Sequence, residues 1–126
     1  MTPYCLLKFN ITTPKGETVL DFGQNLSGWV EFRVRGAAGE RVVLRHFEVL
    51  DAEGNVYLAN LRTAKQCIDY TLRGEGEECF HPHFSFQGFR YVLIERWPGT
   101  PTRDDFVAVV LHSAMTPTGH IETSNA

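Results

Sequence analysis

The hydrophobic pattern of the chain is densest from His83 to Trp97, where apolar side chains would occupy both faces of an extended segment. The apolar residues of this stretch are Phe84, Phe86, Phe89, Tyr91, Val92, Leu93 and Ile94. A strand with two apolar faces needs cover on both sides, so the stretch predicts a central strand in which Phe86 and Tyr91 are buried. Gly88 interrupts it, and the missing Cβ there predicts a β-bulge or a close backbone approach.

Strict alternation of apolar and polar residues predicts a second strand, in the sequence GWVEFRVRG at residues 28–36. Its apolar face carries Val30, Phe32 and Val34, and such alternation is typical of a strand with one face in the core. The opposite face carries Trp29, Glu31, Arg33 and Arg35. An indole among charged side chains suits either a sugar ring or a contact with a neighbouring domain. Trp29, Glu31 and Arg33 are therefore the candidate ligand-binding residues.

Shorter apolar segments, each ended by Gly, Pro, Asn or Asp, predict further strands. They lie within residues 18–23, 41–50, 56–65, 66–74, 79–86 and 106–113. Between them, QNLSG at 24–28 predicts a turn and GAAG at 36–39 a hairpin loop. No helical period of ten or more residues appears. The spacing predicts an all-β fold, an antiparallel two-sheet β-sandwich that is jelly-roll-like, with a closed barrel as the alternative.

The length of 126 residues allows one domain with one core. Residues 1–17 predict an edge strand or a linker remnant, and residues 18–118 predict the β-sandwich domain. Residues 119–126 are polar and alternating.

Composition narrows the range of partners. Apolar residues make up 43% and charged residues 21% of the chain, and a net charge of −3 offers no basic field for nucleic acid or anionic lipid. No apolar run approaches the ~20 residues of a membrane helix, and the first residues lack the pattern of a signal peptide. We expect neither nucleic acid nor a membrane as partner. Cys5, Cys67 and Cys79 cannot all pair with one another and form no CxxC spacing, so we expect free thiols.

Cys79, His81 and His83 form the sharpest candidate metal site, because residues i, i+2 and i+4 share one face of a strand. Zinc also needs a fourth ligand and supporting hydrogen bonds, which no motif here supplies. A solvated or interdomain face is favoured, and we expect no metal and no other cofactor. The sequence DAEGN from Asp51 resembles the front of a calcium loop, but its twelfth position is Arg62, so a reverse turn is favoured.

Candidates for catalysis are weaker still. His46 and Glu48 have the spacing of a base and its orienting carboxylate, yet neighbours two apart on a strand more often hydrogen-bond structurally. Glycoside hydrolysis needs two facing carboxyl groups, one with a raised pKa. Most carboxylates here fall in predicted loops, where water holds their pKa values near normal. These loop residues are Glu53, Glu75, Glu77, Glu78, Asp104 and Asp105. No catalytic residue is assigned.

Three blocks of the sequence, taken together, resemble one family. They are DFGQNLSGWVEFRVRGAAGERVVLRHFEVLDAEGNVYLANLRTAK, DYTLRGEGEECFHPHFSFQGFRYVLIE and TGHIETSN. In this order they are similar to the concanavalin-like β-sandwich domain that precedes the catalytic barrel in bacterial α-L-rhamnosidases. The resemblance covers the chain from about Thr18 to Asn125.

The resemblance implies a multidomain glycoside hydrolase that releases terminal α-L-rhamnose with inversion. Its acid and base carboxylates would lie on an (α/α)6 barrel downstream of a segment like GHIETSNA, so residues 119–126 would begin the link to that missing catalytic domain. The expected role is an accessory domain that packs against and supports the barrel, inactive on its own. The alternative is a carbohydrate-binding module for rhamnose-containing glycans that uses Trp29, Glu31 and Arg33. In the isolated domain, self-association would let a second copy cover Trp29.

Overall fold

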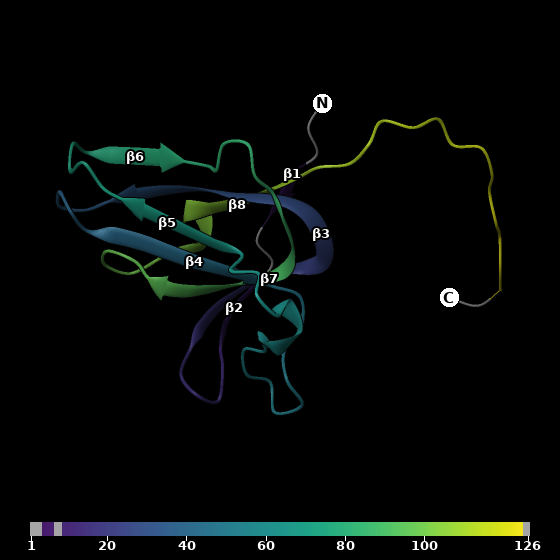
Figure 1. The fold of residues 1–126 in the computed structure, drawn as a ribbon, viewed down its shortest axis with the longest axis horizontal. Coiled ribbons are helices and arrows are strands. Elements are labelled where there is room, and N and C mark those ends of the chain that lie inside the picture. Colours follow the sequence, from purple (N-terminus) through teal and green to yellow (C-terminus); the bar gives the residue numbers. More distant parts are fainter. Residues whose placement is uncertain (1–3, 7–8, 125–126) are drawn as a thin grey trace.

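The computed structural model describes residues 4–6 and 9–124, and it consists almost entirely of antiparallel β-strands (Figure 1). The strands are β1 (Tyr4–Leu6), β2 (Phe9–Thr12), β3 (Thr18–Arg35), β4 (Arg41–Phe47), β5 (Cys67–Thr71), β6 (Glu77–Phe80), β7 (Gln87–Arg96) and β8 (Phe106–Val110). Two short 3-10 helices are η1 (Ala59–Leu61), between β4 and β5, and η2 (Arg103–Asp105), before β8. The all-β prediction is confirmed.

Strand β3 organises the fold because it belongs to both layers. Its first part pairs with β2 and β7, and its last part pairs with β8 and β6. Between these parts the strand curves, as Figure 1 shows at the right of the molecule. One layer therefore has the order β2-β3-β7-β4-β5 and the other β1-β8-β3-β6. This is the two-layer arrangement expected of a β-sandwich.

A break in the β3–β7 register marks the curve. Asp21 pairs with Tyr91 and Leu26 with Phe89, so four residues of β3 stand opposite Arg90 alone. The Arg90 guanidinium donates to both carboxylate oxygens of Asp21, at 2.9 and 3.0 Å, and Asp21 Oδ1 also accepts from the backbone N–H of Gly23 at 2.7 Å. Asp21 is buried, so this pairing fixes the bend from inside the protein.

The space between the layers is filled by apolar side chains from β3, β4, β5, β7 and β8. This inner core consists of Leu20, Phe22, Leu26, Val30, Phe32, Val34, Val42, Leu44, Ile68, Leu72, Phe89, Val92, Phe106 and Ala108. Val30, Phe32 and Val34 are fully or almost fully buried, which confirms the core face predicted from the alternation.

A second, smaller cluster covers the other face of β7. Val19, Phe47 and Tyr91 are buried there, and side chains from β2, from β7 itself and from the connection between β4 and β5 pack on them. Those partly buried residues are Ile11, Leu50, Val56, Leu58, Leu61 and Leu93. Because β7 also lies between β3 and β4, it is covered on both faces and both edges. The central-strand prediction is confirmed.

The start of that strand was predicted wrongly. Strand β7 begins at Gln87, and Phe84 and Phe86 are exposed rather than buried. Strand β6 ends at Phe80, Pro82 follows, and Phe84 takes a left-handed backbone conformation with φ 60°, which no strand accommodates. Gly88 holds no bulge, since it pairs in register with Ser27 of β3, and no close approach, because a Cβ built there meets only Glu48 Oε1 at 3.7 Å.

Three further segments differ from the sequence-based expectation. Residues 24–28 form no turn but continue β3 through its bend. Residues 36–39 do connect β3 to β4, yet these strands are not hairpin partners, since β7 lies between them. Within 56–65 only an isolated bridge from Leu50 to Val56 and the short helix η1 form. The turn predicted at Asp51 is confirmed by its hydrogen bonds with Asn55.

Both ends of the described chain lie at the margins of the sandwich. Strand β1 forms the edge of one layer and β2 pairs with β3. After β8, the segment 111–124, here called the tail, leaves the body as an extended, largely exposed segment without strands (Figure 1). Among residues 4–6 and 9–124, no helix has the length and apolar character needed to cross a membrane.

Candidate functional site

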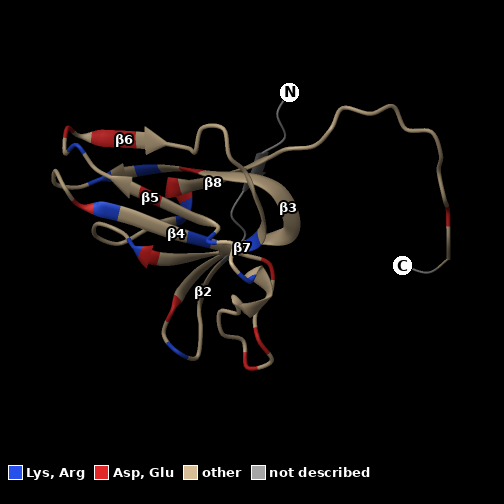
Figure 2. Ribbon diagram, in the orientation of Figure 1, with Lys and Arg blue, Asp and Glu red and all other residues tan. Residues whose placement is uncertain are grey.

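The three candidate ligand-binding residues share one face, as predicted. Trp29, Glu31 and Arg33 lie on the outer surface of the second half of β3, opposite the inner core. Trp29 pairs across to Val109 of β8, and Arg33 pairs to Cys79 of β6. Trp29 and Glu31 are half-buried, whereas Arg33 is exposed. Figure 2 shows the acidic residues of β6 beside the second half of β3, which carries charges of both signs.

The indole of Trp29 is stacked by a second aromatic ring. The His81 ring lies parallel to it, with centroids 5.6 Å apart and an interplanar angle of 18°. The His83 ring stacks on His81 in turn, at 4.9 Å and 13°. Trp29 Nε1 is buried and has no hydrogen-bond partner among the described residues. One face of the indole is thus occupied by protein, which leaves less of it open to a sugar ring.

The same stack contains two of the candidate metal ligands, His81 and His83. Rings that lie parallel present their faces, not their nitrogen atoms, to each other, so His81 and His83 do not converge on one ion. Cys79 Sγ lies 3.9 Å from Glu31 Oε1, and burial, followed by the charge of Glu31, raises the pKa of its thiol. In the described part of the chain, no group of three or more His, Cys, Asp or Glu side chains is arranged to hold a metal.

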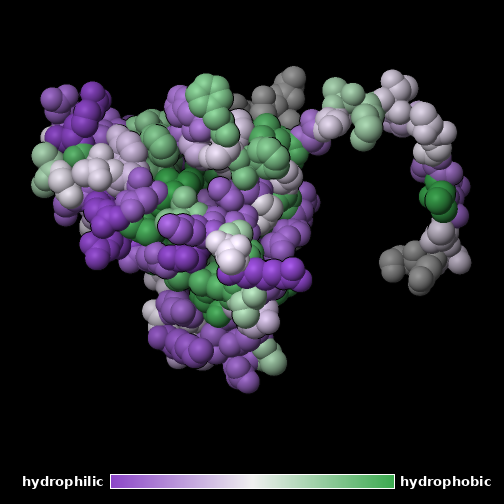
Figure 3. Space-filling view, in the orientation of Figure 1, coloured by the Kyte–Doolittle hydropathy of each residue, from purple (hydrophilic) through white to green (hydrophobic). Residues whose placement is uncertain are grey.

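Beyond the stack, the connection from β6 to β7 exposes two large aromatic side chains. We call residues 81–86 the aromatic loop. Phe84 is completely exposed and Phe86 is 64% exposed. Figure 3 shows apolar side chains projecting from the top of the molecule, above this connection. Sequence reasoning placed both residues in the core; the signal against it was Pro82, which removes a strand hydrogen bond just before them.

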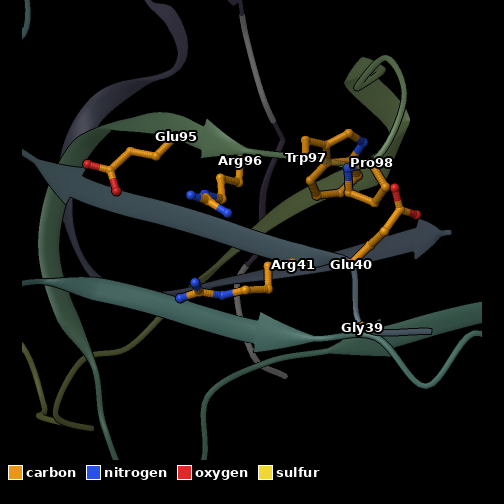
Figure 4. Close-up of a pocket in the computed structure, with 7 residues that line it drawn as sticks. All are labelled: Gly39, Glu40, Arg41, Glu95, Arg96, Trp97 and Pro98. Atoms are coloured by element: carbon orange, nitrogen blue, oxygen red, sulfur yellow. The ribbon is translucent and has the colours of Figure 1, made fainter. Parts of the chain in front are cut away.

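Two open grooves lie on either side of Trp97 and Pro98. The larger has a volume of about 490 Å³ and is lined by Gly39, Glu40, Arg41, Glu95, Arg96, Trp97 and Pro98 (Figure 4). The smaller, of about 230 Å³, is lined by Arg33, Val34, Arg35, Glu77, Trp97, Pro98, Thr100, Thr102 and Asp105. Figure 4 shows the Arg41 and Arg96 side chains extending the same way across the sheet. Arg33 thus borders a groove, but Trp29 and Glu31 line neither.

The carboxylates in these grooves already have partners. In the larger groove, Glu40 accepts a hydrogen bond from the backbone N–H of Ala37 at 2.6 Å, and Glu95 pairs with Arg45 at 2.7 Å. In the smaller groove the carboxylates are engaged in the same way. Glu77 lies 3.4 Å from Arg35, and Asp105 accepts from Thr102. Carboxylates held by cations and N–H donors suit structure better than general acid catalysis, which needs a protonated group.

His46 and Glu48 do not form the catalytic pair considered from sequence. The His46 ring is fully buried, with Nδ1 3.0 Å from the carbonyl oxygen of Gln66, while Glu48 accepts from the side-chain amide of Asn25. Burial lowers the pKa of His46 to about 4. A histidine that stays neutral and is shielded from solvent has a structural role here.

Comparison with known proteins decides the family. Residues 11–112 match the model of the bacterial alpha-L-rhamnosidase concanavalin-like domain. The chain belongs to this family. An alpha-L-rhamnosidase of Streptomyces avermitilis is 47% identical over 115 residues, and one of Formosa agariphila is 31% identical over 115 residues.

Solved structures give the same relationship for the fold. The native α-L-rhamnosidase from Aspergillus terreus superimposes with a TM-score of 0.88 at 42% identity, over 98% of this chain. The Streptomyces avermitilis enzyme, solved in complex with L-rhamnose, gives 0.83 at 42% identity over 90% of this chain. The chain spans only 11–14% of these proteins: 11% and 12% of the two curated relatives, and 14% and 11% of the two solved chains.

Proposed function

We propose that this chain is a non-catalytic accessory domain of a multidomain α-L-rhamnosidase, which packs against and supports the catalytic domain. The observation that carries the proposal is the disparity in coverage. The match to the Streptomyces avermitilis enzyme takes in 90% of this chain but 11% of that protein. Most of what such an enzyme needs therefore lies outside the matched part.

The described surface supports the same role. The acidic residues of both grooves are held by cations or by N–H and O–H donors, so neither of these two grooves combines a free acid and a free base. The indole face that would attract a sugar is stacked by His81. These features favour support of a catalytic domain over catalysis by the chain itself, and over binding of carbohydrate by Trp29, Glu31 and Arg33.

The test uses the Streptomyces avermitilis enzyme in two altered forms, one with its matching segment replaced by this chain and one with that segment deleted. We expect the replaced form to hydrolyse an aryl α-L-rhamnoside and to unfold near the temperature of the unaltered enzyme. The deleted form should lose activity or unfold at a lower temperature, because it lacks the supporting domain. The chain alone should show no turnover.

Two results would contradict the proposal. One is turnover by the chain alone that survives repurification and disappears after a single Glu→Gln substitution. The other is a deleted form with unchanged activity and unchanged melting temperature, since a domain that supports nothing could then be removed without effect.

A further inference from the structure

The aromatic loop exposes its side chains in a way that folding of this domain does not explain. Phe84 is completely exposed and Phe86 is 64% exposed, whereas other phenylalanines of the described chain, such as Phe22, Phe32 and Phe89, are fully buried. An isolated exposed apolar residue is ordinary, but two large aromatic residues on one short loop form a patch typical of an interaction site.

The backbone of the loop holds Phe84 outward. Its φ of 60° lies in the left-handed region, which a residue with a Cβ adopts only at a cost in energy. The stem of the loop is fixed by Pro82 and by the stack of His83, His81 and Trp29. Such strain persists only when the surrounding structure imposes it, and it occurs most often at sites that bind.

The loop lies beside the point where the chain leaves the sandwich. Gly28 of β3 pairs with Gln87, which directly follows the loop, and also with Val110, which precedes the tail. The loop and the tail therefore flank the same residue, and Figure 1 shows both along one upper edge of the molecule. The tail itself exposes Met115 and Ile121, at 81% and 85%, and its apolar side chains stand clear of the body in Figure 3.

We infer that the aromatic loop, together with the adjoining tail, is the surface on which another domain of the same rhamnosidase polypeptide docks. This inference rests on the proposed function and adds the contact that would carry it. The relatives are much larger than this chain, which covers about a tenth of each of them. The rest of such a polypeptide would provide the domain that docks on this surface. Aromatic anchors inserted into a neighbour's pocket are the usual energetic centre of such contacts.

The experiment is hydroxyl-radical footprinting of the Streptomyces avermitilis enzyme that carries this chain in place of its own segment, compared with the chain alone. We expect labelling of Phe84 and Phe86 to fall several-fold in the full-length protein. Val49 and Tyr57, exposed on the connection between β4 and β5, serve as controls and should label equally in both.

A matched pair of variants adds an energetic measurement. Phe84→Ser with Phe86→Ser should lower the melting temperature of the full-length protein by several degrees and leave that of the isolated chain unchanged. Val49→Ser with Tyr57→Ser should change both forms alike.

The outcomes separate the two proposals. Protection of another surface, with the loop labelled as in the isolated chain, would overturn the docking site and leave the accessory role standing. Full labelling of every surface would overturn both. Protection of the loop in a dimer of the isolated chain, but not in the full-length protein, would assign the patch to a second copy and overturn the inference.

Discussion

At the scale of single residues, His46 is the clearest case of chemistry set by burial. Its ring packs edge-on to Phe89 with centroids 4.8 Å apart, and its Nε2 is buried without a partner in the described structure. Among the described residues, the ring makes one polar contact, from Nδ1 to the Gln66 carbonyl; this contact raises the pKa slightly, and burial outweighs it and keeps the ring neutral. Protonation would put an uncompensated charge inside the sandwich.

Stability should therefore depend on pH through His46. Its pKa is lowered from 6.5 to about 4, so the unfolded chain binds a proton that the folded chain does not between these values. The free energy of unfolding should be highest above pH 6.5 and fall as the pH drops towards 4, by up to about 3 kcal/mol. Chemical denaturation at pH 7.5, 6 and 5 measures this slope.

The control is His46→Leu, which keeps the backbone bond from residue 46 to the Gln66 carbonyl. This variant should show a much flatter profile between pH 6.5 and 5, while His120→Leu in the exposed tail should keep the original slope. Glu78, whose pKa is lowered chiefly by the Tyr70 hydroxyl, also loses stabilisation in acid, but only at a lower pH. Equal slopes in the original chain and His46→Leu would show that His46 does not control the profile.

The burial of single residues could be predicted from the sequence where they lie inside a regular strand. Val30, Phe32 and Val34 alternate inside a long strand, so period 2 alone placed them in the core. Phe84 and Phe86 lie in an equally apolar stretch, yet the strand had not begun. Hydropathy reports how strongly a side chain favours an apolar environment, but it does not report the backbone conformation. The left-handed conformation of Phe84 therefore could not be recognised from the hydrophobic pattern.

At the scale of elements, β3 shows why a local turn signal can mislead. The sequence QNLSG has the composition of a turn, but its backbone groups find partners in two different layers instead. The bend depends on long-range contacts, above all the pair formed by Asp21 and Arg90, which are 69 residues apart. No local pattern contains that information.

Two glycines at this bend should respond oppositely to alanine. A Cβ at Gly28 would lie 1.9 Å from the carbonyl oxygen of Val109, which is backbone and cannot move aside. Gly28→Ala should cost about 3 kcal/mol or more, or prevent β8 from pairing. Denaturant unfolding of the purified variant measures the loss.

Gly88→Ala is the matched control, one residue from the partner of Gly28 on the neighbouring strand. The nearest atom to its Cβ is Glu48 Oε1 at 3.7 Å, and its backbone is extended, so the substitution should stabilise by about 0.5 kcal/mol. The opposite result would contradict this prediction. A large loss of stability in Gly88→Ala with little loss in Gly28→Ala would mean that β8 leaves room for a methyl group at residue 28 and that the surroundings of residue 88 do not.

At the scale of the whole molecule, the sandwich and its family could be predicted, but the order of strands could not. Regular alternation and turn spacing were enough for two packed antiparallel layers. The connection at 36–39 is short enough for a hairpin, yet β7 enters between β3 and β4 because its two apolar faces need cover from both clusters. Strands joined by a short connection usually pair with each other. Whether another strand lies between them depends on how the whole core packs.

The outer face of β3 leads to a prediction about sugar. Since His81 occupies one face of the Trp29 indole, the isolated chain should show no saturable fluorescence change with L-rhamnose up to millimolar concentration, where the binding free energy would be only about −4 kcal/mol. The titration is best run in a Trp97→Phe background. A saturable change that vanishes in Trp29→Ala would make this face a carbohydrate-binding site.

The position of β7 also governs how the protein can form during synthesis. Strands β3 and β4 are made early, but the strand that joins them ends at Arg96, about three-quarters of the way along the chain. Until Arg96 has left the ribosome, β3 can pair with β2 and β4 with β5, but no strand joins the two pairs and their apolar residues lack the cover of β7. The described strands can therefore close into the sandwich only after β7, and β8 after it, have been synthesised, so the strand order favours folding of this domain nearly as a whole.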